Sequence, residues 1–266
     1  MNILDTIVAR KQQEVAERKN RVPLKVLEQR PLFSREVISI RQHLLDASRT
    51  GIIAEFKRKS PSRGVINGSA VVEEVTQGYC KAGASALSVL TDTYFFGGSD
   101  QDLLSARRVN ACPILRKDFI LEEYQIVEAR SLGADVILLI AAILEPGQTR
   151  ALVEFAHGLG LEVLLEVHDE VELRTHLDAG MDLMGVNNRN LKTFELSVDT
   201  SRKLVELIPP SVLRVSESGI ESPETIHELR GLGFNGFLIG QTFMQAADPA
   251  RAAMEFMNQV RQHPRS

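Results

Sequence analysis

The residues best suited to chemistry are Glu55 and Lys57, which interrupt an apolar stretch at residues 52–56. Residues i and i+2 of a strand lie on one face, so a carboxylate and an ammonium emerge side by side where this strand ends. Residues 58–64 follow with R-K-S-P-S-R-G, a polar turn with three more cations. Such a pair leading into a cationic loop is typical of a site for an anionic substrate. An isolated E-x-K also fits a structural ion pair, so the rest of the chain has to decide.

Further polar residues follow other apolar runs in the chain. They are Ser88, Arg116, Lys117, Asp118, Glu166, His168, Asn187, Asn188, Arg189 and Glu217. Glu166 comes directly after two leucines, where an unpaired carboxylate costs several kcal/mol. We expect lysines to be its partners. His168 begins H-D-E before a helical stretch, so we expect it to cap that helix rather than to bind a metal.

Two segments late in the chain look like turns that hold a phosphate: S-E-S-G-I at 216–220 and L-I-G-Q at 238–241. Glycine lets the backbone approach an anion, and the N–H groups at a helix start point toward it. Either segment alone is an ordinary turn. Together with the loop at 58–64, they predict an anion-binding site. We expect the loop cations Arg58, Lys59 and Arg63 to steer the anion rather than to catalyse.

Eight short apolar runs repeat along the chain, at 51–56, 86–90, 113–116, 135–140, 161–165, 183–187, 212–215 and 236–239. Nearly continuous runs of this kind are typical of strands buried on both faces of a parallel sheet. They start about 20–35 residues apart, with helical patterns between them, which suits a repeated strand–helix unit. We therefore predict an α/β fold, a TIM (β/α)8 barrel, with its active site at the C-terminal ends of the strands. A doubly wound sheet is the alternative, although no G-x-G-x-x-G follows the first strand.

The first 48 residues lie outside this repeat. Residues 4–19 read as an amphipathic helix with Ile3, Ile7, Val8 and Val15 on one side and charged residues elsewhere. A second helix is expected within residues 38–47. We predict that residues 1–48 form a helical extension packed on the barrel, and that residues 49–266 form the barrel itself. A partner-binding arm is the alternative for the extension.

Composition excludes several classes of protein. A hydrophobic content of 44%, a charged content of 25% and a net charge of -4 are ordinary for a globular protein and indicate no nucleic-acid partner. Two cysteines without a C-x-x-C argue against a disulfide scaffold or a zinc site and suit the cytoplasm. Residues 1–20 show no signal peptide, and the apolar run at 136–144 is too short to span a bilayer. We expect no metal, no cofactor and no membrane, and a monomer, with a weak homodimer as the alternative.

Several segments resemble the indole-3-glycerol phosphate synthase family. They are I-A-E-F-K-R-K-S-P-S-R-G (53–64), L-T-D-T-Y-F-F-G-G (90–98), P-I-L-R-K-D-F (113–119), L-L-E-V-H (164–168), G-V-N-N-R-N-L (185–191) and S-E-S-G-I (216–220). The opening I-L-D-x-I-V-A-R-K is similar to the extra N-terminal helices of this family. The resemblance implies a barrel enzyme that closes the indole ring of 1-(2-carboxyphenylamino)-1-deoxyribulose 5-phosphate, a small phosphorylated substrate. Carbon dioxide and water are released, in a step of tryptophan biosynthesis that needs neither metal nor cofactor.

The resemblance also implies catalytic roles. Lys117 would be the general acid that protonates the substrate carbonyl as the ring carbon attacks, and Glu166 would accept a proton as water leaves. Lys57 would bind the substrate carboxylate or phosphate, or supply the acid for dehydration. Glu55 would pair with the lysines, and Asn187 would hold the substrate hydroxyls. We expect neighbouring cations to lower the pKa of Lys117 and burial to raise the pKa of Glu166.

Binding roles follow in the same way. Arg189 would bind the carboxylate region, and Ser218 would contact the substrate near its ring. The phosphate would be held by Ser60, Gly219, Gly240 and Gln241. Many relatives carry serine where this chain has Gln241, whose backbone N–H can still bind phosphate.

Three other readings of the same residues remain open. A Schiff-base aldolase would also use a barrel lysine, and borohydride trapping with a carbonyl substrate would detect it. A phosphoribosyl isomerase would share the late phosphate segments but leaves the E-x-K strand unexplained. A barrel that acts only as a scaffold would fail a turnover assay.

Overall fold

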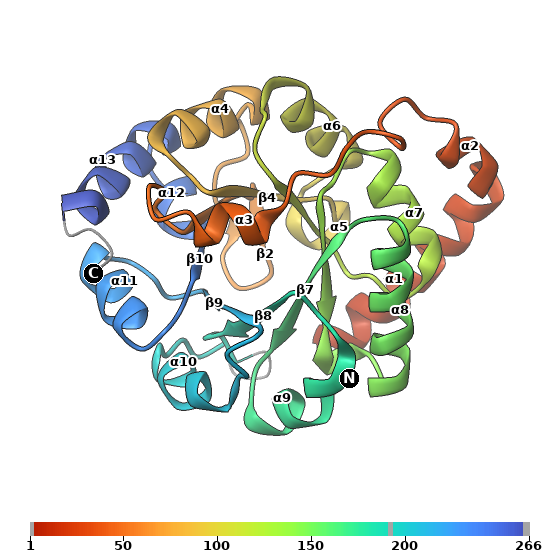
Figure 1. Ribbon diagram of the computed structural model, residues 1–266. Helices are drawn as coiled ribbons and strands as arrows, with labels where there is room; N and C mark the ends of the chain where they lie inside the picture. Colours follow the sequence, from red (N-terminus) through yellow and green to blue (C-terminus); the bar gives the residue numbers. More distant parts are fainter. Residues whose placement is uncertain (1–2, 191–193, 263–266) are drawn as a thin grey trace.

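The computed structural model describes residues 3–190 and 194–262, and its centre is a closed barrel of parallel strands (Figure 1). The strands neighbour one another in the order β1-β10-β9-β8-β7-β6-β5-β4. Their bounds are β1 (Ile52–Phe56), β4 (Ala86–Leu90), β5 (Ile114–Lys117), β6 (Val136–Ile140), β7 (Glu162–Val167), β8 (Leu183–Asn187), β9 (Leu213–Glu217) and β10 (Gly236–Ile239). The predicted TIM barrel is thus confirmed, and the doubly wound sheet is excluded.

Alternation along the strands separates the barrel interior from the surrounding helices. Ile53, Leu115, Leu164 and Val215 pack together in the interior. Their apolar chain neighbours, such as Ile52, Ile114 and Leu165, join a second core beneath the helices. Side chains two residues further along share the same face, so each strand sends alternate residues inward. This alternation decides which polar residues meet at the C-terminal end of the barrel.

The longer helices cover the outside of the barrel between successive strands, and the short helices α5 (Thr93–Phe96) and α12 (Gln241–Met244) lie at its C-terminal rim (Figure 1). The longer helices are α4 (Val72–Ala82), α6 (Asp100–Val109), α7 (Glu123–Ser131), α8 (Pro146–Gly158), α9 (Glu170–His176), α10 (Asp199–Leu204), α11 (Pro223–Gly231) and α13 (Pro249–Gln262), with 3-10 turns at Ala141–Ile143, Leu177–Ala179 and Val205–Leu207. Their ends follow the sequence: Ser222 caps α11, and Gly83 takes the left-handed conformation, at φ 97°, after α4. The loop after β1 contains a short antiparallel hairpin where a plain turn was expected. Its strands, β2 (Lys59–Ser60) and β3 (Gly64–Val65), have two residues each.

The N-terminal extension contacts both ends of the barrel. It comprises α1 (Ile3–Arg21), α2 (Leu24–Glu28) and α3 (Ile40–Leu45). Ile40 and Leu44 of α3 pack into the barrel interior beside Val215, and α3 lies across the near end of the barrel in Figure 1. Glu162, the first residue of β7, accepts hydrogen bonds from the backbone N–H of Ile40 and from the Ser39 hydroxyl, both at 2.6 Å. The helix α3 therefore closes the N-terminal end.

The opposite end receives α1, whose buried stripe contains a lysine. Its buried residues are Ile7, Lys11 and Val15, spaced four apart. The Lys11 Nζ lies 2.8 Å from Asp92 and 2.9 Å from Asp118, two carboxylates at the ends of β4 and β5. The predicted helix is present, but its charged residues do not all face solvent, because Lys11 points into the barrel rim as an ion pair.

The two cysteines, 32 positions apart in the chain, are neighbours in space. Their Sγ atoms lie 2.9 Å apart, and both are free thiols. Cys112 is buried just before β5, and Cys80 lies in α4. Both stand near the N-terminal ends of the strands, away from the end that α1 covers.

Candidate active site

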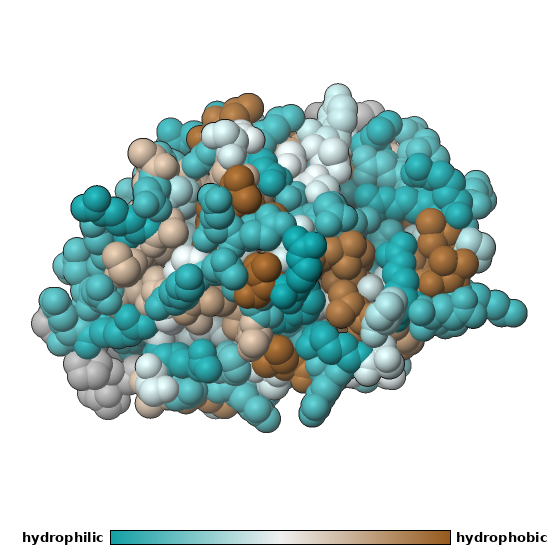
Figure 2. Space-filling model, turned by 90° about the horizontal axis from the view of Figure 1, so that it is seen from above, coloured by the Kyte–Doolittle hydropathy of each residue, from teal (hydrophilic) through white to brown (hydrophobic). Residues whose placement is uncertain are grey.

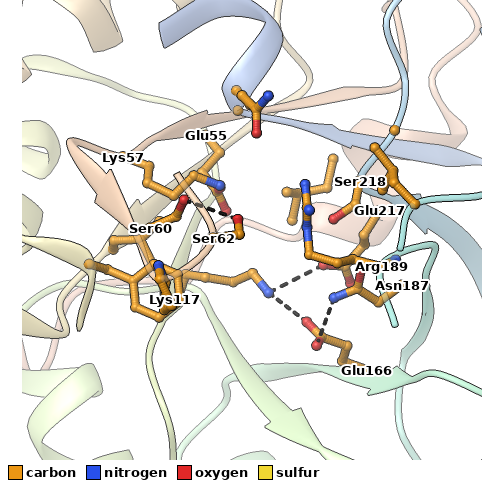
Figure 3. A pocket seen from close by; sticks show the side chains of 18 of the residues that line it. Glu55, Lys57, Ser60, Ser62, Lys117, Glu166, Asn187, Arg189, Glu217 and Ser218 are labelled. Carbon is orange, nitrogen blue, oxygen red and sulfur yellow. Dashed lines mark hydrogen bonds and ion pairs between the residues drawn. The ribbon is translucent and has the colours of Figure 1, made fainter. Parts of the chain in front are cut away.

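One cavity at the C-terminal end of the barrel contains every predicted site residue (Figure 3). Its lining includes Glu55, Lys57, Ser60, Lys117, Glu166, Asn187, Arg189, Ser218, Gly219, Gly240 and Gln241. These residues come from six strands or the loops that follow them, so the barrel brings together groups up to 186 positions apart in the chain (Gln241 minus Glu55). Residues predicted from separate segments thus share one site.

The centre of the cavity is an ion pair between Lys117 and Glu166. The Lys117 Nζ donates to Glu166 Oε2 at 2.6 Å and lies 3.2 Å from Glu217 Oε2 (Figure 3). The Asn187 Nδ2 donates to the other oxygen of Glu166, Oε1, at 3.0 Å. A cation and three polar partners from β5, β7, β8 and β9 therefore converge on one point.

Strand alternation explains why Lys117 rather than Arg116 reaches this point. Lys117 follows Leu115 on the inward face, whereas Arg116 is directed outward and is fully buried beneath the helices. There the Arg116 Nη2 lies 2.6 Å from Glu128 and 3.4 Å from Asp118. Arg116 thus stabilises the outer wall, and Lys117 is the cation available to a substrate.

A second ion pair lies across the cavity on β1 and the residue after it. The Lys57 Nζ donates to Glu55 Oε1 at 2.7 Å, and the Ser88 hydroxyl donates to Glu55 Oε2 at 3.2 Å. Glu55 is buried, while 17% of the Lys57 side chain is exposed to the cavity. Of the two lysines, only Lys117 pairs directly with Glu166.

Both expectations about pKa values are wrong. Burial alone would lower the pKa of Lys117, but the charges of Glu166, Glu217 and Glu55 outweigh it and hold this pKa well above its usual range. Burial alone would raise the pKa of Glu166, but Lys117 and His168 hold it well below its usual range. The cation next to Lys117 in the chain, Arg116, points away from it, and its neighbours in space are the carboxylates of Glu166 and Glu217. The pair therefore rests as an ammonium and a carboxylate.

Glu217 belongs to the site, although the sequence reading did not assign it a role. Its side chain is buried, and burial together with Glu166 and Glu55 raises its pKa to about 7 despite the opposing charge of Lys117. Gly185 on β8 makes room for it, since a Cβ there would lie 2.1 Å from Glu217 Oε1. The inward phase of β9, set by Leu213 and Val215, was the available signal.

His168 also has a different position from the one expected. The cap of α9 is Asp169, whose side chain accepts from the backbone N–H of Glu172. His168 continues the inward face of β7 instead, and its Nε2 lies 3.1 Å from Glu166 Oε1. Its Nδ1 lies 3.0 Å from Glu172 Oε2.

Arg189 and Arg58 differ in what holds them. Arg189 is half-buried, with its guanidinium 3.3 Å from the Phe194 carbonyl and, in the described ranges 3–190 and 194–262, no carboxylate partner. Burial and the nearby Arg63 both lower its pKa. Arg58, expected to steer the substrate, instead makes two hydrogen bonds to Asp102, at 2.7 and 2.9 Å. Arg189 is thus the cation more open to an anion.

The phosphate-binding candidates form one side of the cavity. Ser218 and Gly219 both have left-handed backbone, at φ 68° and 73°, and Asn188 Nδ2 holds the Ser218 carbonyl at 3.0 Å. A non-glycine residue in this conformation is a strain typical of functional turns. Gly240 precedes α12, and a Cβ there would lie 2.6 Å from Glu55 Oε1. Gly219 and Gly240, at the ends of β9 and β10, thus leave the backbone of this wall open to a ligand.

The remaining wall of the cavity is apolar. It includes Ile3, Leu4 and Ile7 of α1 together with Phe96, Phe119, Leu138, Ile140 and Leu238. The cavity therefore offers cations and backbone N–H groups on one side and a surface suited to an aromatic ring on the other. Within the part of the chain that the structure describes, no cluster of three His, Cys, Asp or Glu side chains suits a metal ion.

Comparison with known proteins agrees with this geometry. The family model for indole-3-glycerol phosphate synthase matches residues 4–256. An indole-3-glycerol phosphate synthase of Bacteroides thetaiotaomicron is 46% identical over 97% of this chain and 99% of its own length, and one of Polaromonas sp. is 43% identical over 94% and 96%. Among solved structures, 3-hexulose-6-phosphate synthase from Salmonella typhimurium shares the fold, with a TM-score of 0.62, 14% identity and coverage of 80% of this chain and 99% of that one. The chain belongs to the indole-3-glycerol phosphate synthase family.

Proposed function

We propose that Lys117 and Glu166 are the acid and the base of an indole-3-glycerol phosphate synthase reaction in this cavity. The activity itself is the one the family carries out: 1-(2-carboxyphenylamino)-1-deoxyribulose 5-phosphate loses carbon dioxide and water as its indole ring closes. The observation that carries the assignment is the 2.6 Å contact between Lys117 Nζ and Glu166 Oε2. It supplies a protonated amine and an ionised carboxylate at one point of the cavity.

The reaction needs an acid first and a base later. Lys117 gives its proton to the carbonyl oxygen as the aromatic carbon attacks, which forms the new carbon–carbon bond and a hydroxyl group. The ring then loses carbon dioxide and recovers its aromaticity. Lys57 protonates the departing hydroxyl, and Glu166 takes the proton from the adjacent carbon. Because Glu166 and Lys117 are in contact, this proton can return to Lys117, which resets both groups. Lys57 takes a proton from solvent, because the reaction consumes one proton when the carboxylate leaves as neutral carbon dioxide.

The other residues hold the substrate. Arg189 is proposed to bind the carboxylate before it leaves, since no acidic side chain in the described ranges neutralises it. Ser60, Gly219, Gly240 and Gln241 would bind the phosphate, with Ser218 close to the ring and Asn187 at the hydroxyls. Glu55 would hold the Lys57 ammonium in position through their 2.7 Å contact. Glu217 joins this set as a further carboxyl group that titrates near neutral pH.

A turnover assay tests the proposal. Purified protein is mixed with the anilino-deoxyribulose phosphate, and indole fluorescence is followed with and without EDTA. We expect fluorescence to rise and an equal amount of carbon dioxide to form. Unchanged fluorescence with a folded protein would refute the proposed reaction.

The Schiff-base alternative is less compatible with the site. A Schiff base forms from a neutral amine, and the carboxylates around Lys117 keep it protonated. Borohydride with a carbonyl substrate should therefore leave the mass of the protein unchanged. A covalent adduct on Lys117 or Lys57 would favour the aldolase.

For the molecule as a whole, we propose a barrel of residues 49–266 with an extension of residues 1–48, acting as a monomer in the cytoplasm. On the face shown in Figure 2, apolar side chains form small separate groups among hydrophilic ones, which gives no broad apolar surface for a partner. The described helices include none that is long and apolar enough to cross a bilayer. Light scattering on the purified protein tests the monomer, with a weak homodimer as the alternative.

A further inference from the structure

His168 is a buried, titratable side chain next to the catalytic centre that the reaction above does not use. Only 8% of its side chain is exposed. Its Nδ1 lies 3.0 Å from Glu172 Oε2, and its own backbone N–H donates to that same oxygen at 2.8 Å. Its Nε2 lies 3.1 Å from Glu166 Oε1. The ring is therefore held at one nitrogen, and its other nitrogen lies at ion-pair distance from Glu166 without an aligned hydrogen bond.

This arrangement determines the charge of the ring. Two ionised carboxylates lie within 3.1 Å of the ring nitrogens, and opposite charges this close favour the charged form of histidine, the imidazolium. Burial opposes the charge, but the interactions with Glu166 and Glu172 outweigh it and raise the pKa of His168 to about 9. At neutral pH a fixed cation thus lies beside Glu166.

We propose that His168, held by Glu172, is a positioning residue that keeps the carboxylate of Glu166 oriented and ionised until it accepts its proton. The proposal rests on the proposed role of Glu166 as the base. It names a residue that lies outside the lining of the cavity and acts through Glu166.

The order of the chemical steps shows why a second cation is needed. In the resting site Lys117 balances the charge of Glu166, at 2.6 Å. Once Lys117 has given its proton to the substrate, it is a neutral amine and no longer balances that charge. Of the other groups, Glu217 on β9 adds negative charge near Glu166, and Asn187 on β8 is a neutral donor to it. Glu55 and its partner Lys57 lie across the cavity. His168 is then the cation in direct contact, 3.1 Å away.

The test compares variants that remove the charge with variants that remove the ring. His168→Gln keeps a hydrogen-bond donor without charge, and His168→Leu keeps neither. In both variants we expect kcat to fall at least about 10-fold. A general acid–base group contributes roughly 10²–10⁴-fold, and the variants should lose only part of the contribution of Glu166. KM should stay unchanged, because His168 does not line the cavity. Glu172→Gln, which leaves the ring in place, should give a smaller fall and covers the case in which His168→Leu does not fold.

The pH profile of kcat separates this role from packing. The acidic limb of the profile is the pH range in which kcat falls because Glu166 takes up a proton. A nearby opposite charge lowers a carboxyl pKa by about 1–3 units, so removing the cation should move this limb to higher pH by about that amount. The comparison is repeated in a Glu217→Gln background, which removes the limb that Glu217 contributes. His157→Gln is the matched control, because His157 Nε2 pairs with Asp182 at 2.8 Å on the exposed side of α8. It should leave kcat and the acidic limb unchanged.

Two results would overturn the proposal. One is a His168→Leu variant with the kcat and acidic limb of the unmodified protein. The other is a loss of activity that follows a loss of stability while the limb stays where it was. The role of Glu166 is judged separately. If Glu166→Gln kept the kcat of the unmodified protein, the assignment of Glu166 as the base would fail. If Glu166→Gln lost kcat while the His168 variants behaved normally, only the inference about His168 would be refuted.

Discussion

Replacing Lys11 with methionine should destabilise the protein far more than a typical surface change. The side chains of Asp92 and Asp118 are each 1% exposed, and the Lys11 Nζ lies within 2.9 Å of both. Lys11→Met keeps most of the apolar stem of the side chain and removes the charge. Two buried carboxylates then lose their shared cation, and breaking a buried ion pair costs about 3–5 kcal/mol.

Nearby groups set where in this range the effect should fall. In Lys11→Met, Asp118 would still lie 3.4 Å from Arg116, and Asp92 would still accept a hydrogen bond from the backbone N–H of Phe95 at 2.7 Å. These remaining partners favour the lower end, about 3 kcal/mol of unfolding free energy. At about 2–4 °C per kcal/mol for a chain of this size, the melting temperature should fall by roughly 6–12 °C.

The assay is urea denaturation at pH 7 with Lys19→Met as the control. Lys19 lies on the same helix and pairs with Glu122 at 2.9 Å, but both side chains are 41–50% exposed. A surface pair contributes about 0–1 kcal/mol, so the control should lie near the unmodified protein. KM should also rise in Lys11→Met alone, because α1 carries Ile3, Leu4 and Ile7 to the cavity wall. Equal stabilities for the two variants would refute the view that Lys11 anchors the extension.

Three further predictions follow from the site. Gly240→Val should raise KM, because its Cβ meets Glu55 Oε1 at 2.6 Å and blocks backbone approach to the phosphate; an unchanged KM would remove Gly240 from the phosphate site. Glu217→Gln should gain stability relative to the unmodified protein as pH rises through about 7, because the raised pKa of Glu217 in the folded state gives stability that is present at low pH and lost above that value. Urea titrations at pH 5.5 and pH 8 measure the difference in unfolding free energy between the two proteins. An equal difference at both pH values would contradict this prediction. Activity should persist in EDTA, and a loss that one metal ion restores would show that a metal takes part.

The strands and the convergence of the candidate site residues were predictable because they depend on local pattern. Each barrel strand is a short apolar run, and Glu55, Lys117, Glu166 and Asn187 stand where those runs end. In a closed parallel barrel, all such ends meet at one rim, so the sequence alone assigns separate segments to one site. The resemblance of these segments to a family then gave the roles.

Pairing was not predictable, because it depends on which residues meet across the barrel. Lys11 lies among charged residues on a helix, and only the position of Asp92 and Asp118 makes it a buried ion pair. The pKa of Lys117 follows from carboxylates that are 49 and 100 positions away in the chain, whereas its chain neighbour Arg116 points outward. Contacts of this kind arise from strand order and register, which a pattern of apolar residues does not encode.

The most direct test of the proposed chemistry is the kcat and KM of Lys117→Met and Glu166→Gln, measured by indole fluorescence. Both groups are proposed to act in transition states, so kcat should fall about 10²–10⁴-fold while binding of a phosphate-bearing product analogue persists. Near-normal kcat with lost affinity in Lys117→Met would contradict the account, make Lys117 a binding residue and leave Lys57 as the acid.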